Sequence, residues 1–289
     1  MIIKHYEVKD LNKNKLAWYG FERIGCPEQV RLITKREEKL AHDKGMYSER
    51  DCEVDCFLSV LSEIKKDNVT MMDLGTGWGE WALALGGVIA NKLIPLDIKT
   101  YWTLAVESDP QFFKLAEENF AANKISGMVL NRAIGQGNGY TRINVGSISE
   151  KFCGSSLTYG GYFSNSKAKS FVLGTYSLLS GNVKNVAMVS IDYLMDDYFN
   201  DYVDLLVMDI QGAELLALEG AEKSLDKIDY MMIGTHGRSV HEKTKAMLQG
   251  KFEFVVDAKP GSVTKINKNY SVICQKGQDG ILLCRQKSI

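Results

Sequence analysis

Residues 69–81, VTMMDLGTGWGEW, place an acidic side chain directly before three glycines. Asp73 ends a short apolar run, and Gly75, Gly77 and Gly79 follow at alternate positions. Glycine adopts backbone angles that are closed to other residues and lets a ligand approach the main chain. A carboxylate at the start of such a turn would repel a phosphate but attract a positively charged group. The stretch therefore predicts a binding site for a cationic ligand.

S-adenosylmethionine is a ligand of this kind, because it carries an ammonium and a sulfonium and has no phosphate. A dinucleotide would instead favour the pattern G-x-G-x-x-G. We therefore expect Thr76 and the glycines around it to bind S-adenosylmethionine. Glu107, in AVESDP, is expected to accept hydrogen bonds from the ribose hydroxyls. A plainer role is open for Glu107, which lies just before Pro110 and could simply help to start a helix.

Two further apolar runs end close to ionisable side chains. VDLLVMD ends in Asp209 and YMMIGTH in His236, and we expect both to act as a base or to orient an acceptor hydroxyl. Glu214 is a third catalytic candidate, although it lies in the first turn of a helix, where the dipole favours a carboxylate anyway. Asp209 could equally cap that helix or bind an ammonium, and His236 could be a loop residue. His241 is expected at the surface, and no metal site is expected.

Aromatic residues lie near the expected mouth of the site. Trp78 and Trp81 could stack on adenine or on a sugar, although core packing is the simpler role for Trp81. Tyr159 and Tyr162 fall in residues 146–182, which are rich in Gly, Ser and Tyr. Long irregular segments in compact domains are often functional. The two tyrosines are therefore expected to contact the acceptor.

Strands and helices alternate from residue 67 onward, which predicts a mostly parallel α/β sheet of the Rossmann-like kind in residues 67–289. FEFVVDA and GILLCRQ have no obvious helix between them and predict an antiparallel pair at one sheet edge. Residues 146–182 are expected to form an inserted loop or subdomain. Residues 1–66 are expected to form a helical lid or substrate segment, with Ser48 capping a helix and Asp51 completing the cap.

The composition is that of an ordinary globular protein. The chain has 289 residues, a net charge of −1 and 45% hydrophobic residues. The charge gives no overall attraction to nucleic acid, and no apolar stretch reaches the roughly 18–20 residues of a membrane helix. The start, MIIKHYEVKDLNKNK, lacks the apolar region of a signal peptide, so a cytoplasmic location is expected. The six scattered cysteines are expected to be buried free thiols, and no pattern sets an oligomeric state.

The stretch VDLLVMDIQGAELLALEGAEKSL resembles the hallmark of the FkbM-type methyltransferases. DLGTGWGEW, AVESDP, NRAIG, GSSL, VSIDYLM and IGTHG occur in family order, and the resemblance covers about residues 50–256. It implies a class I methyltransferase sheet and S-adenosylmethionine as cofactor, with contacts that extend to Ser108 and Ala133. Gln211 and Gly234 depart from the family, which commonly has acids near these positions.

The sequence as a whole predicts an S-adenosylmethionine-dependent O-methyltransferase. The resemblance implies that the acceptor is a small molecule or saccharide: a sugar, a glycan or a natural-product-like molecule. One alternative is a nicotinamide-dependent oxidoreductase on the same sheet, which Asp73 disfavours. Another is a non-catalytic cofactor-binding module, which Gln211 and Gly234 would explain.

Overall fold

The computed structural model describes most of the chain from residue 43 onward. The described residues are 43–144, 156–157, 183–200, 202–274 and 279–287, together with Met1, Ile3, Tyr19, Phe21 and Ala41. Most of the segment 146–182, with Tyr159 and Tyr162, lies outside the described residues. So does most of the expected helical segment before residue 43. The predicted domain boundaries therefore stay predictions.

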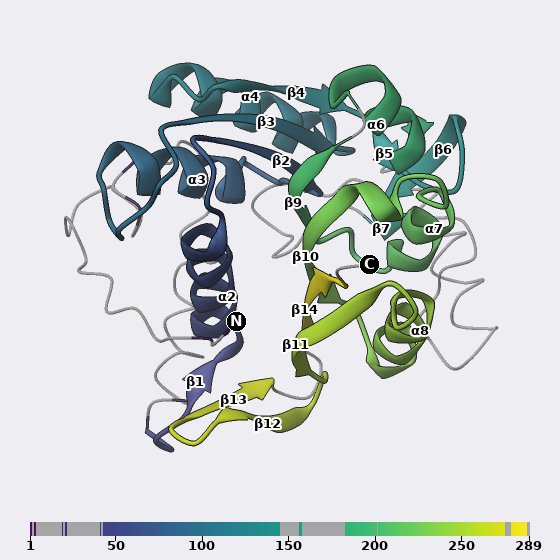
Figure 1. The fold of residues 1–289 in the computed structure, drawn as a ribbon. Helices are drawn as coiled ribbons and strands as arrows, with labels where there is room; N and C mark the ends of the chain where they lie inside the picture. Colours follow the sequence, from purple (N-terminus) through teal and green to yellow (C-terminus); the bar gives the residue numbers. More distant parts are fainter. Residues whose placement is uncertain are drawn as a thin grey trace.

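A seven-stranded sheet forms the centre of the protein (Figure 1). Its strand order is β11-β14-β10-β9-β2-β3-β4, and β14 alone runs antiparallel to its neighbours. The predicted mixed α/β sheet with an antiparallel edge pair is therefore confirmed. The strands are β2 (Asn68–Leu74), β3 (Thr100–Glu107), β4 (Gly127–Asn131), β9 (Val203–Met208), β10 (Ile228–Thr235), β11 (Phe252–Ala258) and β14 (Gly280–Gln286).

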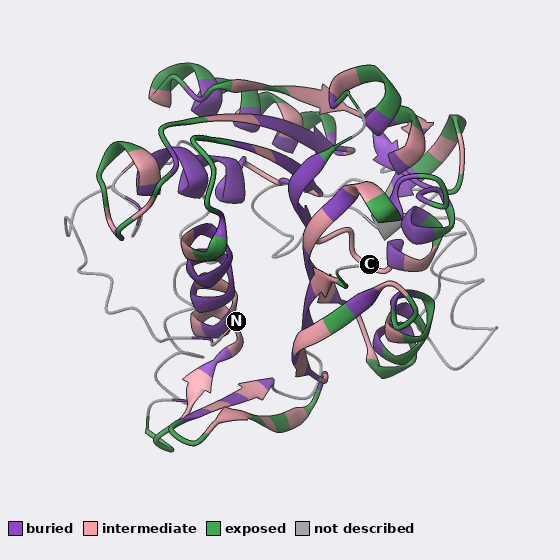
Figure 2. Ribbon diagram, in the orientation of Figure 1, coloured by how far each residue is buried: buried purple, intermediate pink, exposed green. Residues whose placement is uncertain are grey.

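Helices bury both faces of the central sheet, as Figure 2 shows by the purple strands. Adjacent residues of β2 point to opposite faces, so Met71 belongs to the core with α2 and α3, whereas Met72 belongs to the core with α6 and α7. None of the described helices is long and apolar enough to cross a membrane. The helices are α2 (Glu49–Glu63), α3 (Glu80–Ala90), α4 (Pro110–Asn123), α6 (Ile191–Tyr198), α7 (Glu214–Glu219) and α8 (Arg238–Leu248).

Two smaller sheets were not expected from the sequence. The stretch MVLNRAIG is divided after Asn131, and its second half leaves the central sheet to pair with β8. A hairpin also lies between β11 and β14 and pairs with the strand before α2. The strands are β5 (Ala133–Ile134), β6 (Gly139–Asn144), β7 (Ser156–Leu157) and β8 (Val183–Val189) in one sheet, and β1 (Tyr47–Ser48), β12 (Ser262–Asn267) and β13 (Tyr270–Cys274) in the other.

Helix α7 is shorter than the pattern AELLALEGAEKSL predicts. It ends at Glu219, and turns lead to a short 3-10 helix at Leu225–Lys227. Gly220 explains the early end, because a Cβ at this position would lie 2.3 Å from the carbonyl oxygen of Gly135. The chain therefore needs a glycine here to pass close to the segment after β5.

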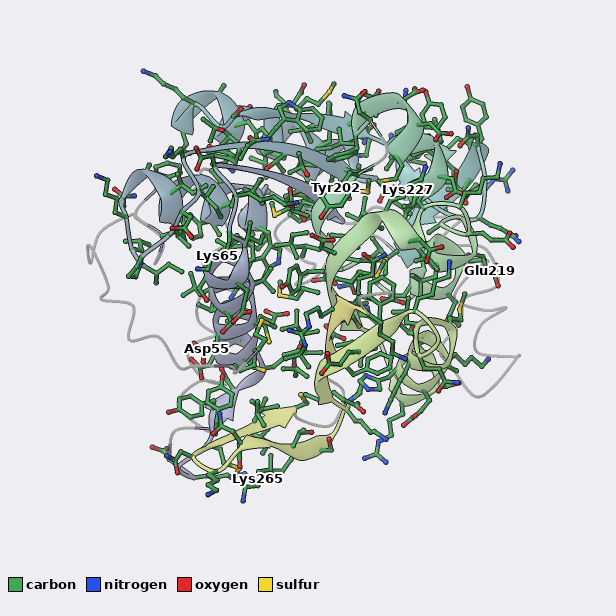
Figure 3. The ribbon with its side chains drawn as sticks, in the orientation of Figure 1. Asp55, Lys65, Tyr202, Glu219, Lys227 and Lys265 are labelled. Carbon is green, nitrogen blue, oxygen red and sulfur yellow. The ribbon has the colours of Figure 1, made fainter. Side chains whose placement is uncertain are left out.

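Helix α2 begins with the predicted cap. The backbone N–H of Asp51 donates to Ser48 Oγ over 3.1 Å, and the Ser48 N–H donates to Asp51 Oδ2 over 2.8 Å. Further along the helix, Tyr270 of β13 donates a buried hydrogen bond of 2.6 Å to Asp55, which Figure 3 labels. The capping box and this bond fix α2 next to the hairpin.

We expect Ser48→Ala to lower the free energy of unfolding by about 1 kcal/mol, because the first turn of α2 loses its side-chain acceptor. Urea denaturation would measure the change. Ser62→Ala is the matched control, since the Ser62 hydroxyl donates to the nearby Ser59 carbonyl in the last turn, and its loss should change stability by less than about 0.5 kcal/mol. Equal losses in the two variants would contradict a stabilising cap.

Candidate active site

The glycine turn after β2 lies at the carboxyl end of the sheet, where the parallel strands finish. Gly75 and Gly77 have φ of 78° and 57°, which favours glycine. A Cβ on Gly75 would lie 1.9 Å from the carbonyl oxygen of Asp209, whereas a Cβ on Gly77 would meet nothing within 4 Å. Gly75 therefore allows the turn to approach the end of β9, and Gly77 leaves the turn open toward a ligand.

Asp73, near the end of β2, holds this turn through a hydrogen bond. It is buried, and Thr76 Oγ1 donates to its Oδ2 over 2.6 Å. Burial raises the pKa of Asp73 to about 7, although the hydrogen bond from Thr76 works in the opposite direction. A positive charge placed nearby would favour the ionised form, so the environment of Asp73 suits a cationic ligand.

Glu107 joins the end of β3 to the same turn. Its carboxylate accepts hydrogen bonds from the N–H of Gly77 at 2.9 Å and from the N–H of Asp109 at 2.7 Å. Burial raises its pKa to about 7, against the effect of these two bonds. The half-buried Ser108 has its hydroxyl 3.4 Å from the Glu107 carboxylate. The structure therefore brings the predicted ribose acid into direct contact with the glycine turn.

Ala133 differs from the other predicted cofactor residues. Its side chain is buried in a small core with Ile143 and Val186, so only its main chain could face a ligand. The neighbouring Asn131 has the clearer connection, since its Nδ2 donates to the carbonyls of Glu107 and Ser108 over 2.8 and 3.1 Å. Nothing in the sequence singles out Asn131, because its partners lie at the end of another strand, β3.

The three predicted catalytic side chains meet one strand further along. His236 Nδ1 lies 2.5 Å from Glu214 Oε1, and His236 Nε2 lies 3.3 Å from Asp209 Oδ1. The His236 side chain is 12% exposed, Glu214 is fully buried and Asp209 is 45% exposed. The group therefore has a buried part, the Glu214–His236 pair, and an accessible carboxylate on Asp209.

The charges of this group determine one another. Burial lowers the pKa of His236, but its bonds to Asp209, Asp279 and Glu214 outweigh burial and raise the pKa well above its usual range. Burial likewise works to raise the pKa of Asp209, and the bond to His236 reverses this and lowers it. The contacts therefore favour the imidazolium form of His236 and the carboxylate form of Asp209.

Asp279 is a member of the group that the sequence did not reveal. Its Oδ2 lies 3.3 Å from His236 Nε2, the same distance as Asp209 Oδ1. Strand β14 runs antiparallel, so its first residue, Gly280, pairs with Thr235 at the end of β10. Asp279 is thereby carried to the carboxyl end of the sheet, and the order of strands was the one signal that could have identified it.

Helix α2 covers the group with a charged pair. Arg50 bonds to Glu53 over 3.0 Å and to Glu80 over 2.6 Å, and its guanidinium lies over the Trp81 ring at 4.7 Å. Burial raises the pKa of Glu53 to about 7; Arg50 opposes the shift, and the charge of Asp209 adds to it. These interactions place α2 beside the catalytic group, and they make Trp81 part of the core, as expected.

Trp78 remains at the open side of the turn. It is half-buried, its Nε1 donates to Glu80 Oε2 over 2.7 Å, and its ring lies 6.3 Å from that of Phe112. Its predicted stacking on a ligand stays a prediction.

The two departures from the family pattern both lie against Asp209. Gln211 has a φ of 53°, and its Nε2 is 3.4 Å from Asp209 Oδ1. A Cβ on Gly234 would lie 3.6 Å from the same oxygen, an ordinary contact distance. Acids at these positions would repel Asp209, so the residues present here reduce the negative charge beside it.

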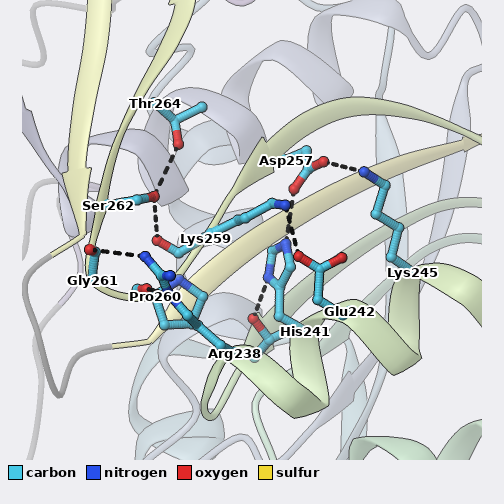
Figure 4. Close-up of polar contacts among 11 residues, drawn as sticks. Arg238, His241, Glu242, Lys245, Asp257, Lys259, Pro260, Gly261, Ser262 and Thr264 are labelled. Carbon is cyan, nitrogen blue, oxygen red and sulfur yellow. Dashed lines mark hydrogen bonds and ion pairs between the residues drawn. The ribbon is translucent and has the colours of Figure 1, made fainter.

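The expectation that His241 lies at the surface is wrong. His241 is fully buried, with Nδ1 2.8 Å from Thr235 Oγ1 and Nε2 2.8 Å from Asp257 Oδ1 (Figure 4). Lys245 Nζ completes the network 2.5 Å from Asp257 Oδ2. Burial is possible because both ring nitrogens have partners. The network ties α8 and β11 to the residue that precedes His236.

Cysteines and metal ligands can be compared with expectation only in the described part of the chain. Cys52, Cys56, Cys274 and Cys284 are buried free thiols there, as predicted. Among the same described residues, no group of three or more His, Cys, Asp or Glu side chains is arranged to hold a metal ion.

We expect the His236 ring to remain protonated at pH 8, because three carboxylates surround it. The ¹⁵N shifts of its ring nitrogens, measured by NMR between pH 5 and 9, would report the protonation state. Glu214→Gln should lower the pKa of His236, since the shortest of the three contacts loses its charge. An unmodified protein whose His236 titrates near the ordinary histidine value of about 6.5 would contradict the imidazolium.

Comparison with known proteins gives one family. The family model described as the methyltransferase FkbM domain matches residues 90–256, more than half of the chain. No curated protein matches the sequence.

Several solved structures are similar in outline. The METTL16 methyltransferase domain is 13% identical, with 91% of this chain and 82% of that chain covered and a TM-score of 0.46. The human methyltransferase 10 domain containing protein is 14% identical, with 90% and 97% covered and a TM-score of 0.41. The ribosomal protein L11 methylase from Lactobacillus delbrueckii subsp. bulgaricus is 12% identical, with 82% and 79% covered and a TM-score of 0.37.

Proposed function

The chain belongs to the FkbM family of S-adenosylmethionine-dependent methyltransferases, and on this premise we propose that it methylates a hydroxyl group of a sugar, glycan or natural-product-like small molecule. One observation carries the proposal. The glycine turn and the ionised Asp209 lie on adjacent strands, joined by a hydrogen bond of 2.9 Å from the Asp209 N–H to the Leu74 carbonyl. A bound cofactor and a carboxylate that can accept a proton would therefore be neighbours.

The residues around the turn fit S-adenosylmethionine. Gly77 leaves open space, and each oxygen of the Glu107 carboxylate accepts one backbone N–H, which leaves lone pairs for the ribose hydroxyls. Asp73 and Glu107 are buried acids that a positive ligand would favour in their ionised forms. The pyrophosphate of a nicotinamide dinucleotide would face the same acids unfavourably, so the oxidoreductase alternative is the weaker one.

Residues of the chain itself can take up the proton that the acceptor hydroxyl loses. S-adenosylmethionine supplies a methyl group already activated on a sulfonium, so positioning contributes much of the rate. Asp209 is ionised and partly exposed, and it accepts the hydrogen of the acceptor hydroxyl. His236 cannot be the base, because it is already protonated; it orients Asp209 and stabilises its charge. Glu214 fixes the His236 ring from the other side.

Cofactor binding tests the first part of the proposal. Titration calorimetry should show binding of S-adenosylmethionine and S-adenosylhomocysteine, with affinity falling as the pH is lowered from 8 to 6. The sign follows from Asp73 and Glu107, whose pKa values of about 7 mean that acid neutralises them. Glu107→Ala should weaken binding about 10- to 100-fold, since bonds to a charged acceptor are lost. The exposed Glu118→Ala should leave it unchanged.

The same measurement with NAD separates the alternatives. Binding of NAD without binding of S-adenosylmethionine would overturn the proposed function. Equal affinities in Glu107→Ala and the unmodified protein would remove Glu107 from the site.

Measurement of methyl transfer tests the second part of the proposal, the methylation of a hydroxyl. Methyl transfer from labelled S-adenosylmethionine would be measured over a panel of monosaccharides, glycans and polyketide-type alcohols. Asp209→Asn should lower kcat about 10²- to 10⁴-fold, the usual contribution of a positioned base, with little change in affinity for S-adenosylhomocysteine. Cofactor binding with no methylation of any panel member would favour a non-catalytic module.

A further inference from the structure

We propose that Asp279 is a positioning residue for methyl transfer, which takes over the Nε2 hydrogen of His236 when Asp209 receives the proton of the acceptor. The proposal rests on the proposed function. Asp279 and Asp209 lie at the same distance, 3.3 Å, from a single nitrogen. That nitrogen carries one hydrogen, so it can donate fully to only one of the two carboxylates at a time.

The geometry at Nε2 is that of a shared hydrogen. His236 Nε2 is buried and makes no hydrogen bond of ordinary geometry to any described residue, although two carboxylate oxygens lie within ion-pair distance. The other ring nitrogen is held at 2.5 Å by Glu214. Glu214 therefore fixes the ring at Nδ1, whereas Nε2 faces two alternative acceptors, Asp209 and Asp279.

The fold brings the two carboxylates from different directions. Asp209 follows β9, on one side of β10, and Asp279 precedes β14, on the other side. His236 follows β10 itself, between them. Asp209 and Asp279 are 45% and 33% exposed, so both can also reach solvent or a ligand, whereas Glu214 is fully buried.

The charges around His236 come from every element packed near it. Asp209 and Asp279 face Nε2, and Glu214 of α7 faces Nδ1. Glu53 of α2, paired with Arg50, is near enough for the charges of Asp209 and Asp279 to raise its pKa. Three carboxylates thus surround one imidazolium. If one of them is neutralised, two still hold the ring in its protonated form.

The proposed step follows from this excess of carboxylates over the single positive charge. The acceptor oxygen forms its bond to the methyl carbon as the bond from that carbon to sulfur breaks, and the hydroxyl proton passes to Asp209. A protonated Asp209 attracts the Nε2 hydrogen less, and the hydrogen turns to Asp279 while it remains on His236. Asp209, being partly exposed, then loses its proton to solvent and attracts the Nε2 hydrogen again. No atom or charge is left over, and His236 never changes its protonation.

The contact can be tested without turnover, by NMR of the His236 ring in Asp209→Asn, Asp279→Asn and the double variant. Each single variant should keep His236 protonated at pH 8, because one carboxylate still faces Nε2. The double variant should lower the pKa of His236 by more than the two single changes combined. A double variant whose titration matches that of Asp209→Asn alone would show that Asp279 does not share the hydrogen, and would overturn the proposal.

Kinetics test the role in catalysis, with the panel acceptor that turns over. Asp279→Asn should lower kcat about tenfold without changing the affinity for S-adenosylhomocysteine. It should also move the acid limb of the kcat–pH profile to lower pH, because Nε2 then donates permanently to Asp209 and lowers its pKa. The exposed Asp67→Asn is the control and should match the unmodified protein.

The outcomes separate this proposal from the proposed function. A fall in kcat with an unmoved acid limb would indicate a merely structural role and would overturn the proposal for Asp279. Absence of S-adenosylmethionine binding in the unmodified protein would overturn the proposed function, whereas the NMR result would still decide whether the hydrogen is shared.

Discussion

The arrangement of the site depends on a buried positive charge, the imidazolium of His236, held among carboxylates. Removing a charge from water is costly unless partners of opposite sign replace the solvent. Glu214, Asp209 and Asp279 are those partners, and they come from three different elements of the chain. The ends of β9 and β10, the start of α7 and the start of β14 meet at one place and so supply these partners.

On the cofactor side of the site, the buried ionisable groups are acids rather than a cation. Asp73 and Glu107 are buried acids whose partners are a hydroxyl and backbone N–H groups, and burial raises both pKa values to about 7. A cation has to come from the ligand if these groups are to be fully ionised. On one side of the site the chain itself supplies the partners of the buried charge, and on the other side the ligand has to supply them. This difference makes ligand binding depend on pH near neutrality, while His236 keeps its charge.

The parts of the site that could be predicted from sequence are those set by neighbours in the chain. The glycine turn and the cap at Ser48 are local features, and they lie where the pattern places them. Asp279 could not be found in this way, because its relation to His236 depends on β14 inserting beside β10. His241 was misplaced for a similar reason: its position in α8 gives no sign of Asp257, a partner on β11. Strands that pair across long separations thus supplied what the sequence could not.

The departures at Gln211 and Gly234 can be understood from the same charges. Both positions touch Asp209, which already stands near Asp279 and Glu53. An additional acid at position 234 would compete with Asp209 for His236 and raise its pKa by repulsion, and so favour a neutral side chain where an ionised one is needed. In this chain Asp279 provides the second carboxylate from the opposite side of β10, at a distance from Asp209 that His236 spans. Asp209 thus has Asp279 as a carboxylate neighbour across His236 and neutral residues at positions 211 and 234, which limits the repulsion that would raise its pKa.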